Sequence, residues 1–323
     1  MRESAFLKKN TAKWQEFEQL LAGTAPNPDH LADLFVQVTD DLSYARTQYP
    51  ESKTTVYLNN LAAKVHLSIY RNRKEKKGRF ITFWKYELPH LFYSIHKQLL
   101  YAFVIFVLAT LVGAVSAAHD ETFVRLILGD DYVNTTLANI ENGDPMGIYK
   151  SAGEVDMFFR ITVNNIKVSF MAFAMGIFLS FGTGLVLMHN GIMLGAFQYF
   201  FYQKGLLLTS VLSIWIHGTL EISSIVIAGA AGLVMGNSIL FPGTYSRMES
   251  FKRGAKTGLK VAVGLVPLFI AAGFLESFVT RLTYWHWSAK LGIILVSALF
   301  IVYYFVIYPI QLNRETREQP NEH

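Results

Sequence analysis

The chain has 323 residues, of which 52% are hydrophobic and only 16% are charged, and its formal net charge is +5. So few charged side chains cannot cover a soluble fold of this length, and the mean hydropathy of +0.29 likewise indicates a membrane protein. The chain contains no cysteine, which excludes disulfides, thiolate metal sites and cysteine nucleophiles.

Residues 1–79 are expected to form a helical region outside the membrane. Apolar residues recur at steps of three and four over residues 31–49 and again over residues 58–69, which is the spacing of amphipathic helices. The intervening Pro50 and Ser52 can end the first helix and cap the second, so the two are predicted to form an antiparallel hairpin on the cytoplasmic side. A shorter helix around Trp14 and Phe17 is expected before them.

A basic run at residues 71–79 leads into a segment rich in aromatic residues. Aromatic side chains mixed with charges suit the headgroup layer of a membrane, so residues 80–97 are predicted to form an interfacial amphipathic helix. The basic run could instead bind RNA, but no soluble RNA-recognition fold accompanies it. Anionic lipid is therefore the expected partner of these residues, and no nucleic acid is expected.

Apolar stretches long enough to cross a bilayer, about 20 residues each, recur from residue 98 onward. Six crossings are predicted, at residues 98–118, 166–188, 191–213, 216–240, 258–278 and 288–310. The third contains Gly205, and it either crosses as a kinked helix or dips in and returns. Residues 119–165 are expected to form an external acidic segment, and residues 313–323 a polar tail. Basic residues near the first crossing and at residues 247–260 place both termini in the cytoplasm.

Several short motifs in the membrane part are specific enough to suggest a family. They are NNIKV at residues 164–168, GTG at 182–184, NGIMLG at 190–195, HGTLE at 217–221 and AGAAG at 228–232. With these motifs the chain resembles the stage II sporulation protein M family, specifically its longer members from non-sporulating bacteria. The resemblance implies a multi-pass protein of the bacterial inner membrane that acts as a scaffold or assembly component of a cell-envelope complex.

His217 and Glu221 are the ionisable residues of most interest within the predicted crossings. Four residues apart on a helix, they share one face. A charge at the bilayer centre costs about 2.5–3.5 kcal/mol on insertion scales, so both side chains should face the interior and meet partners. The candidate partners are Lys204, Glu276 and His189. The cluster is expected either to bind a cation, a proton or a substrate headgroup, or to act as a polar lock between helices or protomers.

Glycines and asparagines are the other residues singled out. Gly191 with Gly195 and Gly232 with Gly236 each form a GxxxG step, and Gly229 precedes the second step. These glycines are expected either to pack helices of one chain against one another or to form a homodimer seam. Three asparagines are expected to cap the ends of the second crossing: Asn164, Asn165 and Asn190.

The sequence contains no P-loop, dinucleotide-binding glycine motif, GxSxG elbow or HExxH motif, so no catalytic residue, cofactor or metal is predicted. The sequence therefore predicts an all-α polytopic membrane protein that serves as a non-enzymatic scaffold. The expected partners are membrane lipids, a second copy of the chain, and membrane or envelope proteins. The first alternative is a transporter or channel with a midplane site at Lys204, His217 and Glu221, and the second is an intramembrane enzyme that uses Glu221.

Overall fold

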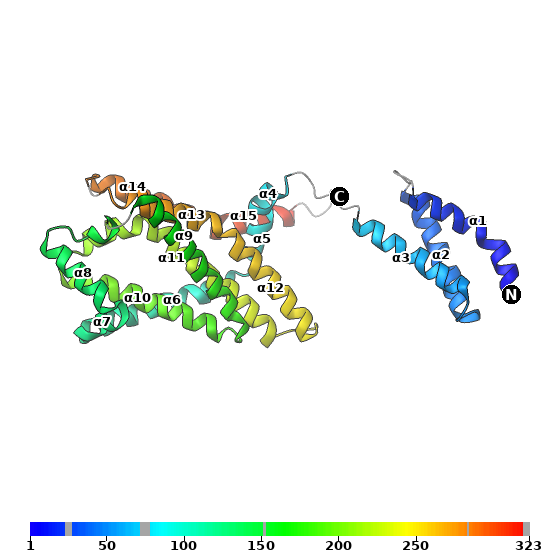
Figure 1. The fold of residues 1–323 in the computed structure, drawn as a ribbon, viewed down its shortest axis with the longest axis horizontal. Helices are drawn as coiled ribbons and strands as arrows, with labels where there is room; N and C mark the ends of the chain where they lie inside the picture. Colours follow the sequence, from blue (N-terminus) through cyan, green and yellow to red (C-terminus); the bar gives the residue numbers. More distant parts are fainter. Residues whose placement is uncertain (23–27, 72–77, 151–152, 283, 319–323) are drawn as a thin grey trace. The chain divides into compact units, whose positions relative to one another are not determined.

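The computed structural model describes residues 1–22, 28–71, 78–150, 153–282 and 284–318, and in these residues every regular element is a helix (Figure 1). The predicted all-α fold is confirmed. The chain divides into two compact units, Met1–Arg79 and Phe80–His323. We call them the N-terminal unit and the membrane unit and describe each by itself.

The N-terminal unit consists of α1 (Glu3–Ala22), α2 (Pro28–Gln48) and α3 (Lys53–Arg71). The three helices enclose a core of their own that includes Trp14, Phe17 and Leu58, each at most 2% exposed. The Trp14 indole also donates a hydrogen bond of 2.8 Å to Asp41, so its one polar atom is satisfied at the edge of this core.

The start of α3 is tied to α1 through a carboxylate. The hydroxyls of Ser52 and Thr54 both donate to Glu3, the latter at 2.7 Å, and these hydrogen bonds lower the pKa of Glu3 from its usual 4.5. A lowered pKa in the folded state means that the contribution of this contact to stability is present above about pH 4.5 and is lost as the pH falls through the folded-state value.

We therefore expect the melting temperature of the N-terminal unit to fall less between about pH 5 and pH 3 in Glu3→Gln than in the wild type, because glutamine accepts the same bonds without titrating. Thermal unfolding followed by circular dichroism at several pH values measures this difference. Parallel pH profiles for the two proteins would contradict the assignment.

The membrane unit contains twelve α-helices in the described residues. Their bounds are α4 (Arg79–Thr82), α5 (Leu88–Ser94), α6 (His96–His119), α7 (Glu121–Leu128), α8 (Asp130–Glu141), α9 (Glu154–Ala174), α10 (Phe181–Gln203), α11 (Leu207–Leu240), α12 (Arg247–Gly264), α13 (Val266–Phe274), α14 (Trp287–Val302) and α15 (Tyr308–Glu318). Two 3-10 turns, η2 (Gly147–Lys150) and η3 (Met175–Ile177), and three π-helical turns, η1 (Phe83–Glu87), η4 (Leu275–Val279) and η5 (Tyr303–Ile307), interrupt or connect them.

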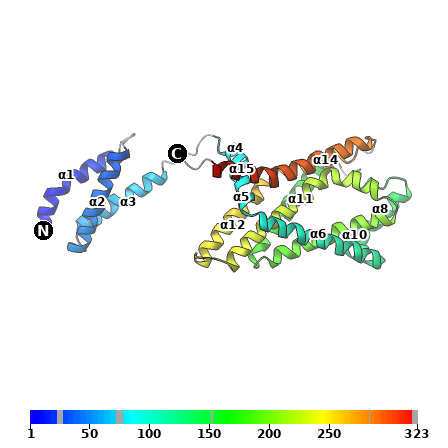
Figure 2. The same ribbon diagram turned by 180° about the vertical axis from the view of Figure 1, so that it is seen from behind.

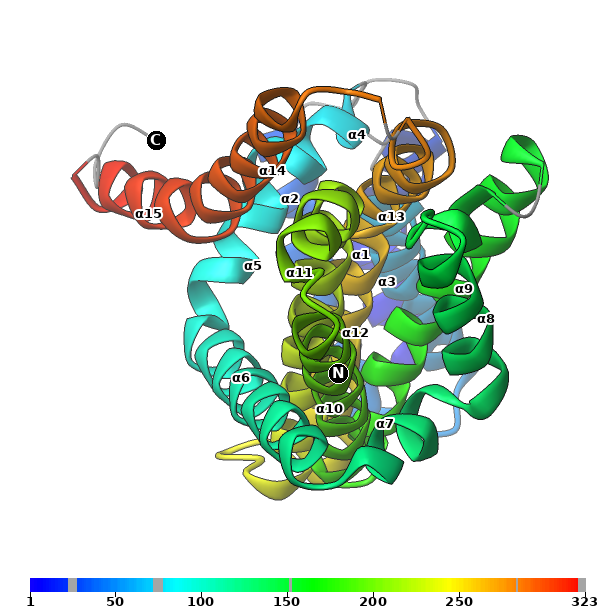
Figure 3. The ribbon, with the colours of Figure 1, turned by 90° about the vertical axis from the view of Figure 1, so that its left-hand side faces the viewer.

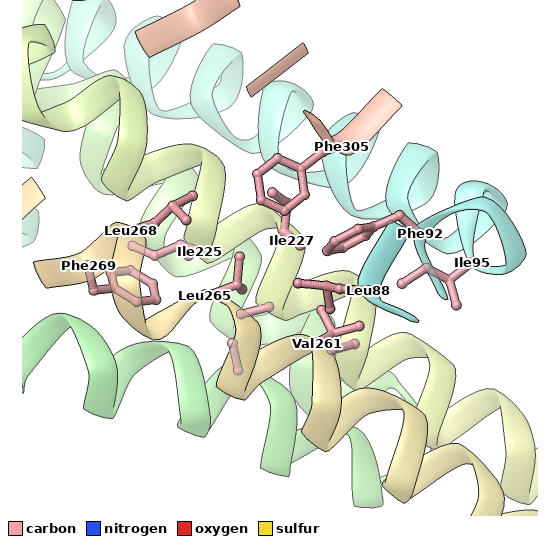
Figure 4. Packing of buried hydrophobic residues seen from close by; sticks show 13 residues of the cluster. Leu88, Phe92, Ile95, Ile225, Ile227, Val261, Leu265, Leu268, Phe269 and Phe305 are labelled. Atoms are coloured by element: carbon pink, nitrogen blue, oxygen red, sulfur yellow. The ribbon is translucent and has the colours of Figure 1, made fainter. Parts of the chain in front are cut away.

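Helix α11 is the central element of the membrane unit. Figure 3 shows it in the middle of the bundle, with α6 on one side and α9 on the other, and it also packs against α10, α12, α13 and α14. A main core lies beside it, where Ile225 and Ile227 meet Val261, Leu265 and Phe305 (Figure 4). A long, predominantly apolar helix that is surrounded in this way is typical of the interior of a membrane bundle.

Four helical stretches are long and apolar enough to cross a membrane: His96–His119, Leu207–Leu240, Arg247–Val279 and Trp287–Thr316. The bounds of two other predicted crossings, residues 166–188 and 191–213, are wrong. The chain turns at residues 178–180, where Leu179 and Ser180 have φ of 54° and 68°, instead of at residues 189–191. The predicted break between residues 213 and 216 is also wrong, because α11 is continuous there and the turn falls at Gly205, with φ of 70°.

The segment predicted as one interfacial helix, residues 80–97, is divided among α4, η1, α5 and the start of α6. Phe80 and Ile81 are exposed, but Leu88 and Phe92 are at most 1% exposed and belong to the main core. Leu88 can approach so closely because Gly264 has no side chain: a Cβ there would lie 2.5 Å from Leu88. The second half of this segment is therefore an internal packing element of the membrane unit.

The first and last helical segments of the membrane unit are joined by hydrogen bonds. The hydroxyl of Tyr304 donates to the Trp84 carbonyl at 2.6 Å, and that of Tyr308 donates to the Lys85 carbonyl at 2.9 Å. Both carbonyls belong to the π-helical turn η1. Figure 2 shows the adjoining helices α5 and α15 side by side, in agreement with their contacts.

Candidate functional site

Three ionisable side chains of the membrane unit converge beside α11. His217 and Glu221 lie one turn apart on α11, and Glu276 comes from η4. One ligand atom from each of the three lies within 4.8 Å of the others, and His217 Nε2 is 3.7 Å from Glu276 Oε2. The side chains of His217 and Glu276 are only 5% and 13% exposed. The sequence expectation that His217 and Glu221 face the interior agrees with this geometry.

The π-helical turn explains why Glu276 points inward. In such a turn one extra residue fits into the helix, which rotates the following side chains relative to an α-helix. Residues Leu275–Val279 form the turn, so Glu276 and the adjacent Thr280 both reach α11. π-Helical turns of this kind are frequent at functional sites.

Thr280 sets the orientation of the imidazole ring. Its hydroxyl donates to the Leu275 carbonyl at 3.2 Å, and the same oxygen lies 3.0 Å from His217 Nδ1. Because the threonine O–H donates to the carbonyl, the threonine oxygen accepts a hydrogen bond from the Nδ1–H group. The Nε2 atom then presents its lone pair toward Glu276.

The cluster borders a cavity of about 930 Å³. Helices α7 to α11 and η4 all contribute to its lining, with apolar residues such as Met157 and Phe197 and a few polar groups. Asn165 of α9 is one of these and is 5% exposed. Its amide is close enough to Glu221 to interact with it, yet in the described part of the chain its Nδ2 atom makes no hydrogen bond of ordinary length and angle.

Some of the residues predicted for this site lie elsewhere. Lys204 follows the last residue of α10 and is exposed, so it does not join the cluster. His189 lines the cavity but is exposed. Asn165 and Thr280 were not identified as partners of the cluster, because both are brought to it only by packing between helices.

The predicted capping role of the three asparagines is wrong. Asn164 and Asn165 lie inside α9, and Asn190 lies inside α10, where its amide donates to the Val186 carbonyl at 2.8 Å. The pair Asn190 and Gly191 resembles a helix end in the sequence, but in the structure it lies inside a continuous helix. Asn164, Asn165 and Asn190 all line the 930 Å³ cavity.

The predicted glycine seam consists of contacts between helices of the same chain. A Cβ at Gly195 would lie 2.0 Å from the Thr110 carbonyl oxygen of α6, and one at Gly191 would lie 2.7 Å from Ala109. On α11, a Cβ at Gly229 would meet Leu187, one at Gly232 would meet Thr183, and one at Gly236 would meet Ser180, at 2.2–2.6 Å. The backbones therefore pack at distances that only glycine permits.

An all-helical bundle with several candidate membrane-crossing helices and a buried group of ionisable side chains defines a polytopic membrane protein. The family model for stage II sporulation protein M matches residues 102–281, more than half of the chain. The chain belongs to this family, and the matched segment contains His217, Glu221 and Glu276.

The N-terminal unit matches a different family model. Residues 4–71 correspond to a domain of unknown function, DUF8413. The comparisons with curated proteins and with solved structures gave no significant match. The two matched segments fall on either side of the boundary at Arg79, one in each compact unit.

Proposed function

We propose that the chain is a non-enzymatic membrane scaffold, an assembly component of a bacterial cell-envelope complex. The observation that carries this proposal is the division into two units with separate cores, each matched by its own family model. In such an arrangement, the membrane unit anchors the chain in the inner membrane, and the N-terminal unit provides a separate helical surface for a partner protein.

The interior of the membrane unit fits an anchoring role. The glycine contacts of α10 and α11 and the buried ionisable cluster tie α6, α9, α10, α11 and η4 to one another. Polar side chains that meet across helices in the bilayer stabilise association by about 0.6–2 kcal/mol each. Membrane lipids surround this unit, and a second copy of the chain or another envelope protein is the proposed partner.

Photo-crosslinking in living cells tests the scaffold function. A photoreactive amino acid at Val36 or Val56, which are 58% and 59% exposed in the N-terminal unit, should give discrete adducts of defined mass. The same probe at Phe17, which is fully buried, is the control and should give none of these adducts. Identical patterns at exposed and buried positions, or adducts only with unselected abundant proteins, would contradict a scaffold.

A transporter or channel is the second candidate function, and the 930 Å³ cavity beside the buried cluster is the observation that favours it. Ionisable residues inside a membrane bundle are often part of a path for ions or solutes. Purified protein in proteoliposomes should then conduct ions or exchange a solute, and Glu221→Gln should abolish that flux while Glu249→Gln, whose side chain lies in α12 and is 46% exposed, should not. Equal flux in both variants would exclude a path through the cluster.

A further inference from the structure

We propose that His217, Glu221 and Glu276 bind one divalent transition-metal cation of the Zn²⁺ class at the border of the 930 Å³ cavity. The sequence left binding of a cation here as one of two alternatives and named no metal, because only His217 and Glu221 are close in the chain. The third, Glu276, comes from a different helical segment and reaches the pair only through the π-helical turn η4. This inference does not depend on the scaffold function.

The separations of the ligand atoms suit one small cation. Two ligands that each lie about 2.1 Å from a tetrahedral zinc ion are about 3.4 Å apart. His217 Nε2 and Glu276 Oε2 are 3.7 Å apart, and all three ligand atoms lie within 4.8 Å of one another. Side-chain movements that shorten the widest of these separations by at most about 1.4 Å would bring the three atoms to bonding distance.

The charges of the cluster also match a dication. Two carboxyl groups face one imidazole in an interior where an unpaired charge costs several kcal/mol. One divalent cation would neutralise both carboxylates together. Arg160, which also lines the cavity, is exposed, and Arg281 forms an ion pair of 3.1 Å with Glu154.

The groups around the cluster are arranged as in protein metal sites. A metal-bound histidine usually donates its other ring nitrogen to an oxygen, which fixes the tautomer. Thr280 provides that oxygen for Nδ1 and so leaves Nε2 as the ligand atom. Asn165 offers a second buried donor, Nδ2, which makes no hydrogen bond of ordinary geometry in the described part of the chain. A water molecule that completes the metal coordination from the cavity would accept a hydrogen bond from it.

The donor set favours zinc over calcium or magnesium. Calcium and magnesium prefer sites made entirely of oxygen ligands, whereas an imidazole nitrogen with carboxylates suits zinc and its neighbours in the first transition series. Three protein ligands beside an open cavity leave one coordination position for water or another ligand.

The test uses the full chain, purified in detergent or nanodiscs with an affinity tag free of histidine. We expect the wild type to bind one equivalent of Zn²⁺ or Co²⁺, and Co²⁺ to show the visible spectrum of a four-coordinate nitrogen and oxygen site. Glu221→Gln and Glu276→Gln should each weaken binding by at least about 10-fold, whereas His119→Gln and Glu249→Gln, which alter residues outside the cluster, should not.

A positioning variant keeps the proposal testable if a ligand variant fails to fold. Thr280→Val removes the oxygen that orients His217 and should weaken Zn²⁺ binding by about 10- to 100-fold, and Thr280→Ser should restore it. The proposal is wrong if the folded wild type binds Zn²⁺ and Co²⁺ no better than the Glu221→Gln/Glu276→Gln double variant, or if Ca²⁺ and Mg²⁺ bind equally well. Photo-crosslinking at Val36 is independent of these results, so the scaffold function and the metal site can fail separately.

Discussion

Adding a single methyl group at Gly195 is expected to force α6 and α10 apart and to destabilise the membrane unit by more than about 3 kcal/mol. In Gly195→Ala, the new Cβ would lie 2.0 Å from the Thr110 carbonyl oxygen and 2.7 Å from the Ala114 amide nitrogen. Both are backbone atoms of a helix, so they cannot rotate out of the way as a side chain could. The yield of monodisperse protein and its thermal midpoint in detergent measure the effect.

Gly184→Ala is the matched control in the same helix. A Cβ at this position meets no atom within 4 Å, and alanine is favoured over glycine in a helix by about 1 kcal/mol. The control should therefore melt at the same temperature as the wild type or slightly higher. If the two variants melt together, α6 and α10 are not in the close contact that the structure shows.

Trp14→Ala is expected to unfold the N-terminal unit while leaving the membrane unit intact. Trp14 is 2% exposed, its ring centroid lies 5.5 Å from that of Phe6, and its indole nitrogen donates to Asp41. Replacing a buried tryptophan by alanine costs about 3–5 kcal/mol. A unit of this size has a free energy of unfolding of only a few kcal/mol, so the loss is comparable with the whole of it.

Limited proteolysis of the purified full chain measures this prediction. Residues 1–79 should be digested rapidly in Trp14→Ala, and the membrane unit should survive as a protected fragment of constant mass. Leu7→Ala, which alters a residue of the same helix that is 36% exposed, should remain as resistant as the wild type. Equal resistance of all three proteins would show that Trp14 is not part of an essential core.

The sequence allows much of the fold to be predicted, because helix formation and burial leave periodic patterns. The stripes around Val38 and Leu58 correspond to buried faces of α2 and α3, and the apolar stretches correspond to α6, α11 and α14. The bounds near Asn190 and Gly191 could not be predicted correctly. A glycine that permits close packing against Ala109 has the same local signature as a glycine that permits a turn.

The candidate site could be predicted only in part for a related reason. His217 and Glu221 share a helix face, which their spacing alone determines. Glu276 was one of several candidate partners, and only the π-helical turn selects it from among them. Asn165 and Thr280 meet the cluster through contacts between distant segments, and no local pattern in the sequence encodes such contacts.

The hydrogen bonds from Tyr304 and Tyr308 to Trp84 and Lys85 constrain the topology. Groups less than 3 Å apart lie at the same depth, so any placement of this unit in a bilayer must put the segments that open and close it at one level. A placement with the two segments on opposite sides would separate these partners by the full hydrocarbon thickness of about 30 Å.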